Sequence, residues 1–594
     1  MRIQKISYNY SIPAFKNNLQ AKNTRAMDGK QDTRIMNEVN FSGVQNVNFT
    51  TVSKMTTYAV DLLKQKGLKQ GQELYIKGDA KFLPFMEILS KEAYKIGSGF
   101  IVLNVIEPEI EALKHKYNVI EEFDYKKMQF QHALDSGALV FEFCDENNPY
   151  TSARISDEEL KAELEKGVVD VPDEIREIFK AEPKEILKDA MDIHKGQPVF
   201  IKGEREHLPL IVKLAEYLYG ENQSQLLTVL IANNQYKNFI KFADESLLEY
   251  VPESDIAMFK EFYEKDVAWL QLEGSDPKEM EGLDSAKIIK NRQARNLAVE
   301  EYHSKTTTNV PWLVYYAPTT KSIKDVYTEF GDDSLKALAK AYEDANKINR
   351  MGSLEQHVQA LDYRATKMNE LLQNGYRTLH YVSVDKDTKL PDGKTDFKIT
   401  MSPKSVFNSA RCKMPKYNHN PLVNIPTEEV FTAPQADTAQ GVVSVTMPLS
   451  LNGQIIEGIR LTFDKGKVVE IHADKNEDML RNYINENKNA DRLGEVALVA
   501  GSPIAAMGRL FNSTLLDENA SCHLALGNAY SDCIIGAEDI EDFSEQKKYL
   551  EGLNINSSPT HTDFMIGGEN VYITAINDET GDVIEVIKDD KFLL

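Results

Sequence analysis

The pattern of hydrophobic and polar residues changes twice along the chain. Residues 1–47 are rich in Asn, Gln, Lys and Ser without sustained periodicity, which is typical of a mobile tail. Beyond them, helical apolar patterns alternate with short strand-like runs at 74–77, 100–105 and 139–143. Because strands that alternate with helices favour an α/β layer, we expect the first half of the chain to be α/β.

A sequence repeat lies inside this half. The pattern Gly-Gln-x-x-x-Ile-Lys-Gly, followed by Leu-Pro, begins at Gly71 and recurs at Gly196, an offset of 125 residues at every matched position. Both copies read as a turn, a short strand and a helix, the helices covering 85–96 and 210–220. Seven matches in one register predict a duplicated α/β unit. The acidic, helix-prone segment 145–190 is interpreted as the connection, with a solvated helix face.

From about residue 386 the chain is rich in β-structure. Runs at 441–448, 455–463 and 468–473 are separated by turn sequences at 452–453 and 464–466, which predicts an antiparallel meander. A helix is expected at 475–487, so we expect a separate α+β domain. The predicted division is a tail over 1–47, a first α/β repeat over 48–165, a second repeat with the rest of the N-terminal domain over 166–385, and the C-terminal domain over 386–594.

Composition and charge narrow the class of protein. Of the 594 residues, 42% are hydrophobic and 27% charged, which is typical of a globular protein and excludes a collagen-like fibre or a disulfide scaffold. The net charge of −23 opposes binding to nucleic acid or to anionic membranes. Four isolated cysteines, and a chain without a recognisable signal peptide or spanning segment, favour a soluble protein in the cytoplasm.

Potential metal ligands are concentrated after residue 425, whereas the GxxxxGK[ST] and GxSxG motifs are absent. The ligands lie in apolar segments, where a bare carboxylate is costly to bury. Each alone has an ordinary explanation, such as the polar end of a strand or a satisfied core histidine. Together, two histidines and four carboxylates suit a pair of divalent ions (Zn, Co or Mn) better than one structural zinc. The candidates are one of the adjacent pair Glu428 and Glu429, together with Glu495, Glu518, His523, His561 and Asp563, while Cys522 is interpreted as a small buried residue rather than a soft ligand.

Longer motifs in this region resemble those of a known enzyme family. NIPTEEVFTAP, LGEVALV, LLDENASCHLALGNAY and HTDFMIG follow one another as in the thermophilic-type metallo-aminopeptidases, the AmpS and PepS family. The resemblance is clear over roughly residues 260–590 and weak over the first repeat, and the N-terminal half is longer than the family's by about one α/β unit. It implies a two-domain peptidase with two metal ions near the domain junction, usually a homodimer that encloses its active sites.

The resemblance also implies roles for single residues. The expected metal ligands are Glu429, Glu495, Glu518, His523, His561 and Asp563, with Tyr530 as a catalytic hydroxyl. The two ions would activate a shared water for attack on the scissile carbonyl. A carboxylate must bridge the ions, and both Glu495 and Asp563 fit that role. The general base that passes a proton to the leaving amine is Glu428 or Glu495.

The expected reaction is the removal of N-terminal residues from short peptides with a free N-terminus. A metal-dependent amidase or a carboxypeptidase is one alternative. A carboxypeptidase needs a cationic clamp, and the nearest candidates, Arg411, Arg460 and Arg509, lie outside the ligand motifs. A non-catalytic scaffold that retains the peptidase domain is the other alternative, and the survival of every ligand position argues against it.

Overall fold

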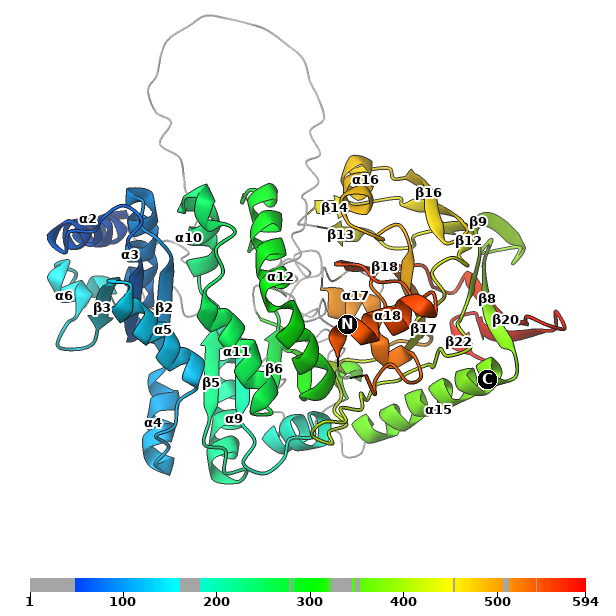
Figure 1. Ribbon diagram of the computed structural model, residues 1–594, viewed down its shortest axis with the longest axis horizontal. Helices are drawn as coiled ribbons and strands as arrows, with labels where there is room; N and C mark the ends of the chain where they lie inside the picture. The colour runs from blue at the N-terminus through cyan, green and yellow to red at the C-terminus, as the bar shows by residue number, and fades with distance from the viewer. Residues whose placement is uncertain are drawn as a thin grey trace, which may run out of the picture.

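The computed structural model of the protein describes residues 49–156, 158–160, 182–276, 279–280, 282–319, 322, 344–347, 353–451, 454–505, 511, 513–540 and 542–594. The predicted tail over 1–47, residues 157 and 161–181 of the predicted connection and the predicted turn at 452–453 lie outside the described residues. Figure 1 shows the described chain as an elongated body. A small α/β unit, a larger parallel sheet with its helices, and a C-terminal β-rich part follow one another along its long axis.

The first unit is built around a three-stranded parallel sheet with the order β2-β1-β3. Its buried side chains, such as Ile76 and Phe85, pack with Phe239 and Ile240 of helix α10 (Gln235–Phe242) from the next unit, so the two units share a core. The strands are β1 (Leu74–Asp79), β2 (Ile101–Ile106) and β3 (Leu139–Phe143), as the sequence predicted. The helices are α2 (Phe49–Gln65), α3 (Leu83–Ile96), α4 (Pro108–Tyr117), α5 (Asp124–Asp135) and α6 (Pro149–Ser152).

The second unit contains a five-stranded parallel sheet with the order β10-β7-β6-β4-β5. All side chains of Trp312–Tyr316 are buried, as expected for a parallel strand that is covered on both faces. The strands are β4 (Val199–Gly203), β5 (Leu227–Ile231), β6 (Ala268–Glu273), β7 (Trp312–Tyr316) and β10 (Asn424–Ile425). The helices are a π-helical turn (Glu185–Ala190), α9 (Leu208–Gly220), α10 (Gln235–Phe242), α11 (Glu253–Glu264) and α12 (Ser285–Asn309).

The larger antiparallel sheet has eight strands in the order β16-β15-β12-β9-β8-β20-β21-β22. These are β8 (Tyr376–Val384), β9 (Pro391–Thr400), β12 (Gln440–Ser444), β15 (Arg460–Asp464), β16 (Lys467–His472), β20 (Val571–Asn577), β21 (Val583–Lys588) and β22 (Lys591–Phe592). Residue 386, where the sequence predicts the C-terminal domain to begin, lies between the paired strands β8 and β9. The sheet therefore includes a strand from before that position.

A four-stranded antiparallel sheet and several helices complete the C-terminal part. The sheet has the order β11-β17-β18-β19, formed by β11 (Glu429–Thr432), β17 (Leu493–Val499), β18 (His523–Gly527) and β19 (His561–Met565). The remaining elements are the hairpin of β13 (Leu449–Leu451) and β14 (Gln454–Ile456), and the helices α15 (Ser353–Gln373), α16 (Glu477–Glu486), α17 (Thr514–Glu518) and α18 (Phe543–Gly552). The mixture of parallel and antiparallel sheets confirms the predicted α/β and α+β classes.

The predicted meander is confirmed, except that one of its strands is divided. β12, β15 and β16 pair antiparallel in sequence order. The run 455–463 does not form one strand, because it is interrupted at Gly458 and its first residues pair with β13 instead. Gly458 has a φ of +66°, and a Cβ there would lie 2.1 Å from Asp474 Oδ2. The apolar pattern continued through this bend, so the pattern alone did not indicate it.

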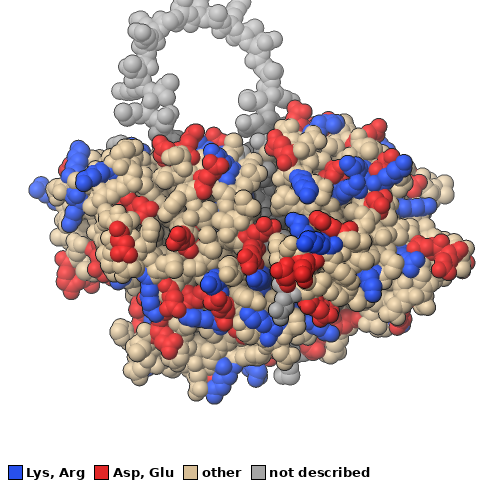
Figure 2. Space-filling view, in the orientation of Figure 1, with Lys and Arg blue, Asp and Glu red and all other residues tan. Residues whose placement is uncertain are grey.

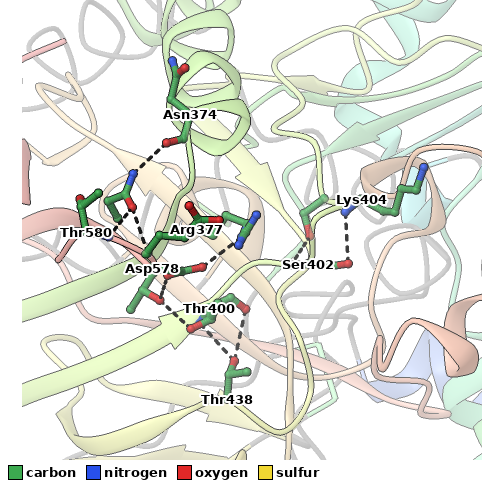
Figure 3. Close-up of polar contacts among 12 residues, drawn as sticks. Asn374, Arg377, Thr400, Ser402, Lys404, Thr438, Asp578 and Thr580 are labelled. Carbon is green, nitrogen blue, oxygen red and sulfur yellow. Dashed lines mark hydrogen bonds and ion pairs between the residues drawn. The ribbon is translucent and has the colours of Figure 1, made fainter. Parts of the chain in front are cut away.

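Side chains fasten one end of the eight-stranded sheet near helix α15 (Figure 3). Asp578 accepts hydrogen bonds from Arg377 Nε at 3.0 Å and from Thr378 Oγ1 at 2.8 Å. Thr400 N–H donates to Thr438 Oγ1 at 3.1 Å, which ties β9 to the loop before β12. A surface pocket of about 160 Å³, lined by residues that include Arg377 and Ser402, lies beside these contacts, and none of the predicted site residues lines it.

The described surface carries charges of both signs, and the four cysteines are free. Acidic and basic side chains are interspersed over the described part of the face in Figure 2. Cys144, Cys412, Cys522 and Cys533 are all free. Among the described residues, no helix combines the length and apolar character needed to cross a bilayer.

Replacing Gly527 by alanine is expected to destabilise the four-stranded sheet. Gly527 has a φ of +106°, and a Cβ there would lie 2.0 Å from the Thr560 carbonyl oxygen. The clash and the strained backbone together are expected to cost about 3 kcal/mol. Gly581→Ala is the control, because it also has a positive φ (+76°) but nothing within 4 Å, and it should cost about 1 kcal/mol. Thermal melting followed by circular dichroism measures both, and equal midpoints would contradict the expectation.

Candidate metal centre

The four-stranded sheet separates an apolar face from a polar one. Side chains alternate between the faces of a strand, so residues at every second position share a face. One face packs into the largest hydrophobic core of the molecule. Its side chains are Val430, Val496, Leu498, Leu524, Leu526 and Phe564.

The opposite face carries five of the six predicted metal ligands. Glu495 pairs across the sheet with Ala525, and Ala525 pairs with Asp563. His523 pairs with Ala497, His561 pairs with Gly527, and Glu429 pairs with Val499, all in the same alternation. Ala497, Ala525 and Gly527 have small or no side chains and leave room for the polar groups. The sheet therefore brings together residues that lie up to 134 positions apart in sequence.

The five side chains form two groups that share one member. One ligand atom each from Glu429, Glu495 and His523 lies within 4.8 Å of the others, and the same holds for Glu495, His561 and Asp563. His561 Nε2 lies 2.9 Å from Glu495 Oε2 and 3.1 Å from Asp563 Oδ1. His523 Nε2 lies 3.1 Å from Glu429 Oε2. All five residues are buried, so the two groups form one enclosed cluster.

Backbone carbonyls fix the orientation of both imidazole rings. His561 Nδ1 lies 2.7 Å from the Asn528 carbonyl oxygen, and His523 Nδ1 lies 3.1 Å from the Ser521 carbonyl oxygen. Because a carbonyl only accepts, Nδ1 donates in each case and Nε2 is directed at the carboxylates. This is the arrangement in which histidines commonly bind metal ions through Nε2.

The electrostatics of the cluster favour a bound cation. Burial lowers the pKa of His561, but the neighbouring Asp563 and Glu495 outweigh it and raise the pKa to about 10. Burial likewise lowers the pKa of His523, but Glu429 and the other carboxylates raise it to about 9. Glu495 is fully buried, and no hydrogen-bond donor for its Oε1 is found among the described residues. Buried carboxylates of this kind are normally paired or bound to metal, so the donor set fits divalent ions.

Two predicted catalytic residues lie outside the two ligand groups, and Tyr530 is in contact with one of them. The Tyr530 hydroxyl lies 3.0 Å from His561 Nε2, and the Tyr530 ring is held edge-on to Phe431. Glu428 is in neither metal group and forms an ion pair with Lys347. His357 Nε2 also lies 3.6 Å from Glu428 Oε2.

Sequence reasoning assigned no role to Asn519 or Lys347. The buried Asn519 Oδ1 accepts a hydrogen bond of 2.7 Å from the Glu428 N–H, and thereby positions the Glu428-Glu429 pair. The sequence signal for Asn519 was an asparagine within the apolar run that also contains His523. Lys347 lies 81 residues before its partner, and no local pattern indicates such a contact.

The sixth predicted ligand and Cys522 lie outside the two groups. Glu518 is buried at the end of α17, and this helix packs against β19. Cys522 is buried and exchanges hydrogen bonds with the backbone of Val499, with its Sγ 3.1 Å from the Val499 carbonyl oxygen. Cys522 thus behaves as a buried structural residue, as the sequence predicted.

The centre lies where the two largest parts of the protein meet. Strand β10 belongs to the parallel sheet, and β11, which begins with Glu429, follows three residues later. The Ser513 hydroxyl, just before α17, donates a hydrogen bond of 2.8 Å to the half-buried Glu273 at the end of β6. The chain leading to the metal ligands is therefore anchored on the parallel sheet.

Comparison with known proteins agrees with this site. The thermophilic metalloprotease family M29 matches residues 184–592, a span that contains all the predicted ligands. The chain belongs to family M29. It is therefore a metal-dependent peptidase. The M29 match does not extend to the first α/β unit.

Individual M29 relatives support the assignment. The chain is 31% identical over 391 residues to aminopeptidase AmpS of Bacillus subtilis (strain 168), which covers 65% of this chain and 91% of the relative. It is 29% identical over 397 residues to aminopeptidase T of Thermus aquaticus, covering 66% and 92%. The structure also matches wild-type AmpT from Thermus thermophilus, with a TM-score of 0.61, 27% identity and coverage of 70% of this chain and 99% of the other.

Metal binding at the M29 centre is expected to release protons. With pKa values of about 9 and about 10 in the metal-free protein, His523 and His561 are both protonated at pH 7 and must lose these protons to bind an ion. Up to about two protons per chain should therefore be released at pH 7, and the apparent affinity should rise with pH. Zinc titrations by calorimetry in buffers of different ionisation enthalpy measure the release. An affinity that does not change between pH 6 and pH 8 would contradict it.

Proposed function

We propose that this M29 protease is an aminopeptidase that holds two divalent ions, one in each group of the metal centre. The observation that carries the proposal is that Glu495 belongs to both groups. A carboxylate shared by two ligand sets is suited to bridge two ions, and this favours Glu495 over Asp563 as the bridge. The imidazole and carboxylate donors suit Zn, Co or Mn. Glu518 stays a predicted sixth ligand.

When bound, the ions would supply Lewis acidity that activates water and polarises the scissile carbonyl. The residues of the chain hold the substrate and move the protons. The Tyr530 hydroxyl, 3.0 Å from His561 Nε2, is placed to donate to the oxygen on which negative charge develops. Glu428 lies next to the ligand Glu429 but outside both groups, so it remains available to carry a proton to the leaving amine. Its contact with Lys347 holds the Glu428 side chain in place.

The charge of the centre supports action at the amino end of a peptide. Carboxylates of the site that are not neutralised by an ion would attract the α-ammonium of a substrate, whereas a terminal carboxylate needs a cation. Arg411 donates to the Asn420 carbonyl oxygen, and Arg460 donates to the Gly393 carbonyl oxygen, so both serve other contacts. Arg509, the third clamp candidate, lies outside the described residues. Short peptides with a free N-terminus are therefore the proposed substrates, and a cytoplasmic homodimer stays a prediction.

The first α/β unit is further proposed to be a second copy of the unit that follows it. The strand order β2-β1-β3 has its counterpart in β5-β4-β6, with Ile76 and Ile201 in the middle strands. In both units, a 3-10 turn precedes a helix that has proline in its first turn. Since the family match begins at residue 184, this copy is an addition to the peptidase.

Replacing Glu495 by glutamine is expected to deplete the metal and lower kcat by roughly 100-fold or more, because the shared carboxylate charge is lost while the volume is kept. Glu428→Gln is the matched control. It should retain the metal, because Glu428 is in neither group, but lose turnover if Glu428 carries the proton. Elemental analysis and steady-state kinetics separate the two effects. A Glu495→Gln protein with full metal content and full turnover would refute the assignment.

Acetylation of the substrate tests selectivity for the amino end. A dipeptide p-nitroanilide with a free N-terminus should be cleaved, and its N-acetylated form should lose at least about tenfold in kcat/KM, because the cation that pairs with the carboxylates is removed. The metal content is the same in both assays, so metal loss cannot mimic the result. Equal turnover of the two substrates would favour the amidase alternative.

A further inference from the structure

A second cluster of metal-binding side chains lies outside the M29 centre. His194 precedes β4, Asp266 precedes β6, and His419 precedes β10. All three strands belong to the parallel sheet and run in the same direction, so the cluster lies at the amino-terminal ends of the strands. The metal centre lies beyond the carboxyl-terminal end of β10. The two clusters therefore lie at opposite ends of the strands.

The three side chains are close enough to share one ion. One ligand atom from each lies within 4.8 Å of the others, and His419 Nε2 lies 2.9 Å from Asp266 Oδ2. The rings of His194 and His419 stack with their centroids 4.0 Å apart, so the exposed His194 ring would turn to direct a nitrogen at the same ion as His419. His419 is buried whereas His194 is exposed, so the cluster reaches from the interior to solvent.

Hydrogen bonds orient the His419 ring so that Nε2 points into the cluster. His419 Nδ1 lies 2.9 Å from the Asp192 carbonyl oxygen and must donate to it. The Gln197 amide nitrogen, which can only donate, lies 3.3 Å from His419 Nε2 and donates to the Asp266 carbonyl oxygen at 2.9 Å. Gln197 Oε1 accepts a hydrogen bond of 2.7 Å from the backbone N–H of His194, which fixes the orientation of the amide. Nε2 is therefore the nitrogen available to bind a cation.

The carboxylate of Asp266 completes this arrangement. Its Oδ2 lies 2.9 Å from His419 Nε2, a contact that either a proton on Nε2 or a metal ion shared by the two atoms accounts for. Its Oδ1 is buried, and no hydrogen-bond partner for it is found among the described residues. A buried carboxylate oxygen of this kind is normally hydrogen-bonded or bound to a cation.

The same arrangement recurs at the two histidines of the metal centre. His523 and His561 also donate from Nδ1 to a backbone carbonyl and direct Nε2 at carboxylates. We propose that His194, Asp266 and His419 form a separate site for one divalent ion of the zinc class. Two imidazoles and one carboxylate suit Zn, Co, Ni or Cu better than Mg or Ca. Because His194 is exposed, the remaining coordination position faces solvent.

An ion at this site would join three segments that are far apart in sequence. His419 lies in the loop that leads to β10 and then to Glu429, so the ion would fasten this loop to the beginnings of β4 and β6. A ligand that binds only the folded state raises the melting temperature. The site would thus stabilise the junction without taking part in peptide hydrolysis.

Zinc uptake by matched variants tests the site. The metal-free full-length protein, His194→Ala and Asp266→Asn are dialysed against zinc alone, and the bound zinc is counted by elemental analysis. His194 is exposed, and Asp266 has a φ of +53° that asparagine also adopts, so both variants keep the fold. His115→Ala, another exposed histidine, is the control. The expected result is one zinc fewer per chain in the two site variants, with the control unchanged.

Peptidase activity and thermal stability complete the test. Both site variants should keep wild-type kcat/KM when the metal centre is loaded, and zinc should raise their melting temperature less than that of the wild type. The difference between matched variants does not depend on how many ions the metal centre holds, so failure here is distinct from failure of the proposed function. Equal zinc counts in the wild type and both site variants, or an equal loss in the control, would overturn the proposal.

Discussion

The organisation of the C-terminal part depends on keeping buried carboxylates next to imidazoles on one face of a four-stranded sheet. Glu429, Glu495 and Asp563 are almost inaccessible to water, and an uncompensated charge in such a place is costly. The sheet supplies the compensation by alternation, because the apolar side chains face the core while every second residue faces the cluster. The small residues Ala497 and Ala525 are as much a part of this arrangement as the ligands, since they provide the space.

The parallel sheet serves the centre as a support. Strand β10 is the edge strand of this sheet, and the chain reaches Glu429, the first predicted ligand, within a few residues. A hydrogen bond from Ser513 to Glu273 anchors the segment before α17 on the same sheet. The position of the metal centre therefore depends on contacts between the two parts. The first α/β unit shares a core with the second and makes no contribution to the ligand set.

Three buried histidines follow one pattern of hydrogen bonding. In each, Nδ1 donates to a backbone carbonyl and Nε2 is directed at carboxylate oxygen. This pattern fixes the orientation of these three rings before any ion arrives, so none of the three has to rotate on binding. It occurs both in the M29 metal centre and in the cluster of His194, Asp266 and His419, at the amino-terminal ends of the parallel strands. What the two sites have in common is this hydrogen-bond arrangement of their histidines.

The sequence by itself determined the local elements and the identity of the chemistry. Apolar periodicity predicted β1, β2, β3, α3, α9 and the meander of β12, β15 and β16, because these features depend on near neighbours in the chain. Carboxylates and histidines in apolar segments, together with the order of the motifs, predicted a metallopeptidase. The division of the run 455–463 escaped prediction, since Gly458 bends the chain against Asp474, a residue outside that run.

Only the tertiary structure decided which side chains meet. Strand register placed Glu495 in both ligand groups, and it left Glu428 outside them, paired with Lys347. The three segments that bring His194, Asp266 and His419 together are separated by at least 72 residues, and nothing in their local sequence indicates that they converge. Local sequence constrains backbone conformation over a few residues, whereas sheet register and packing bring together residues that are remote along the chain.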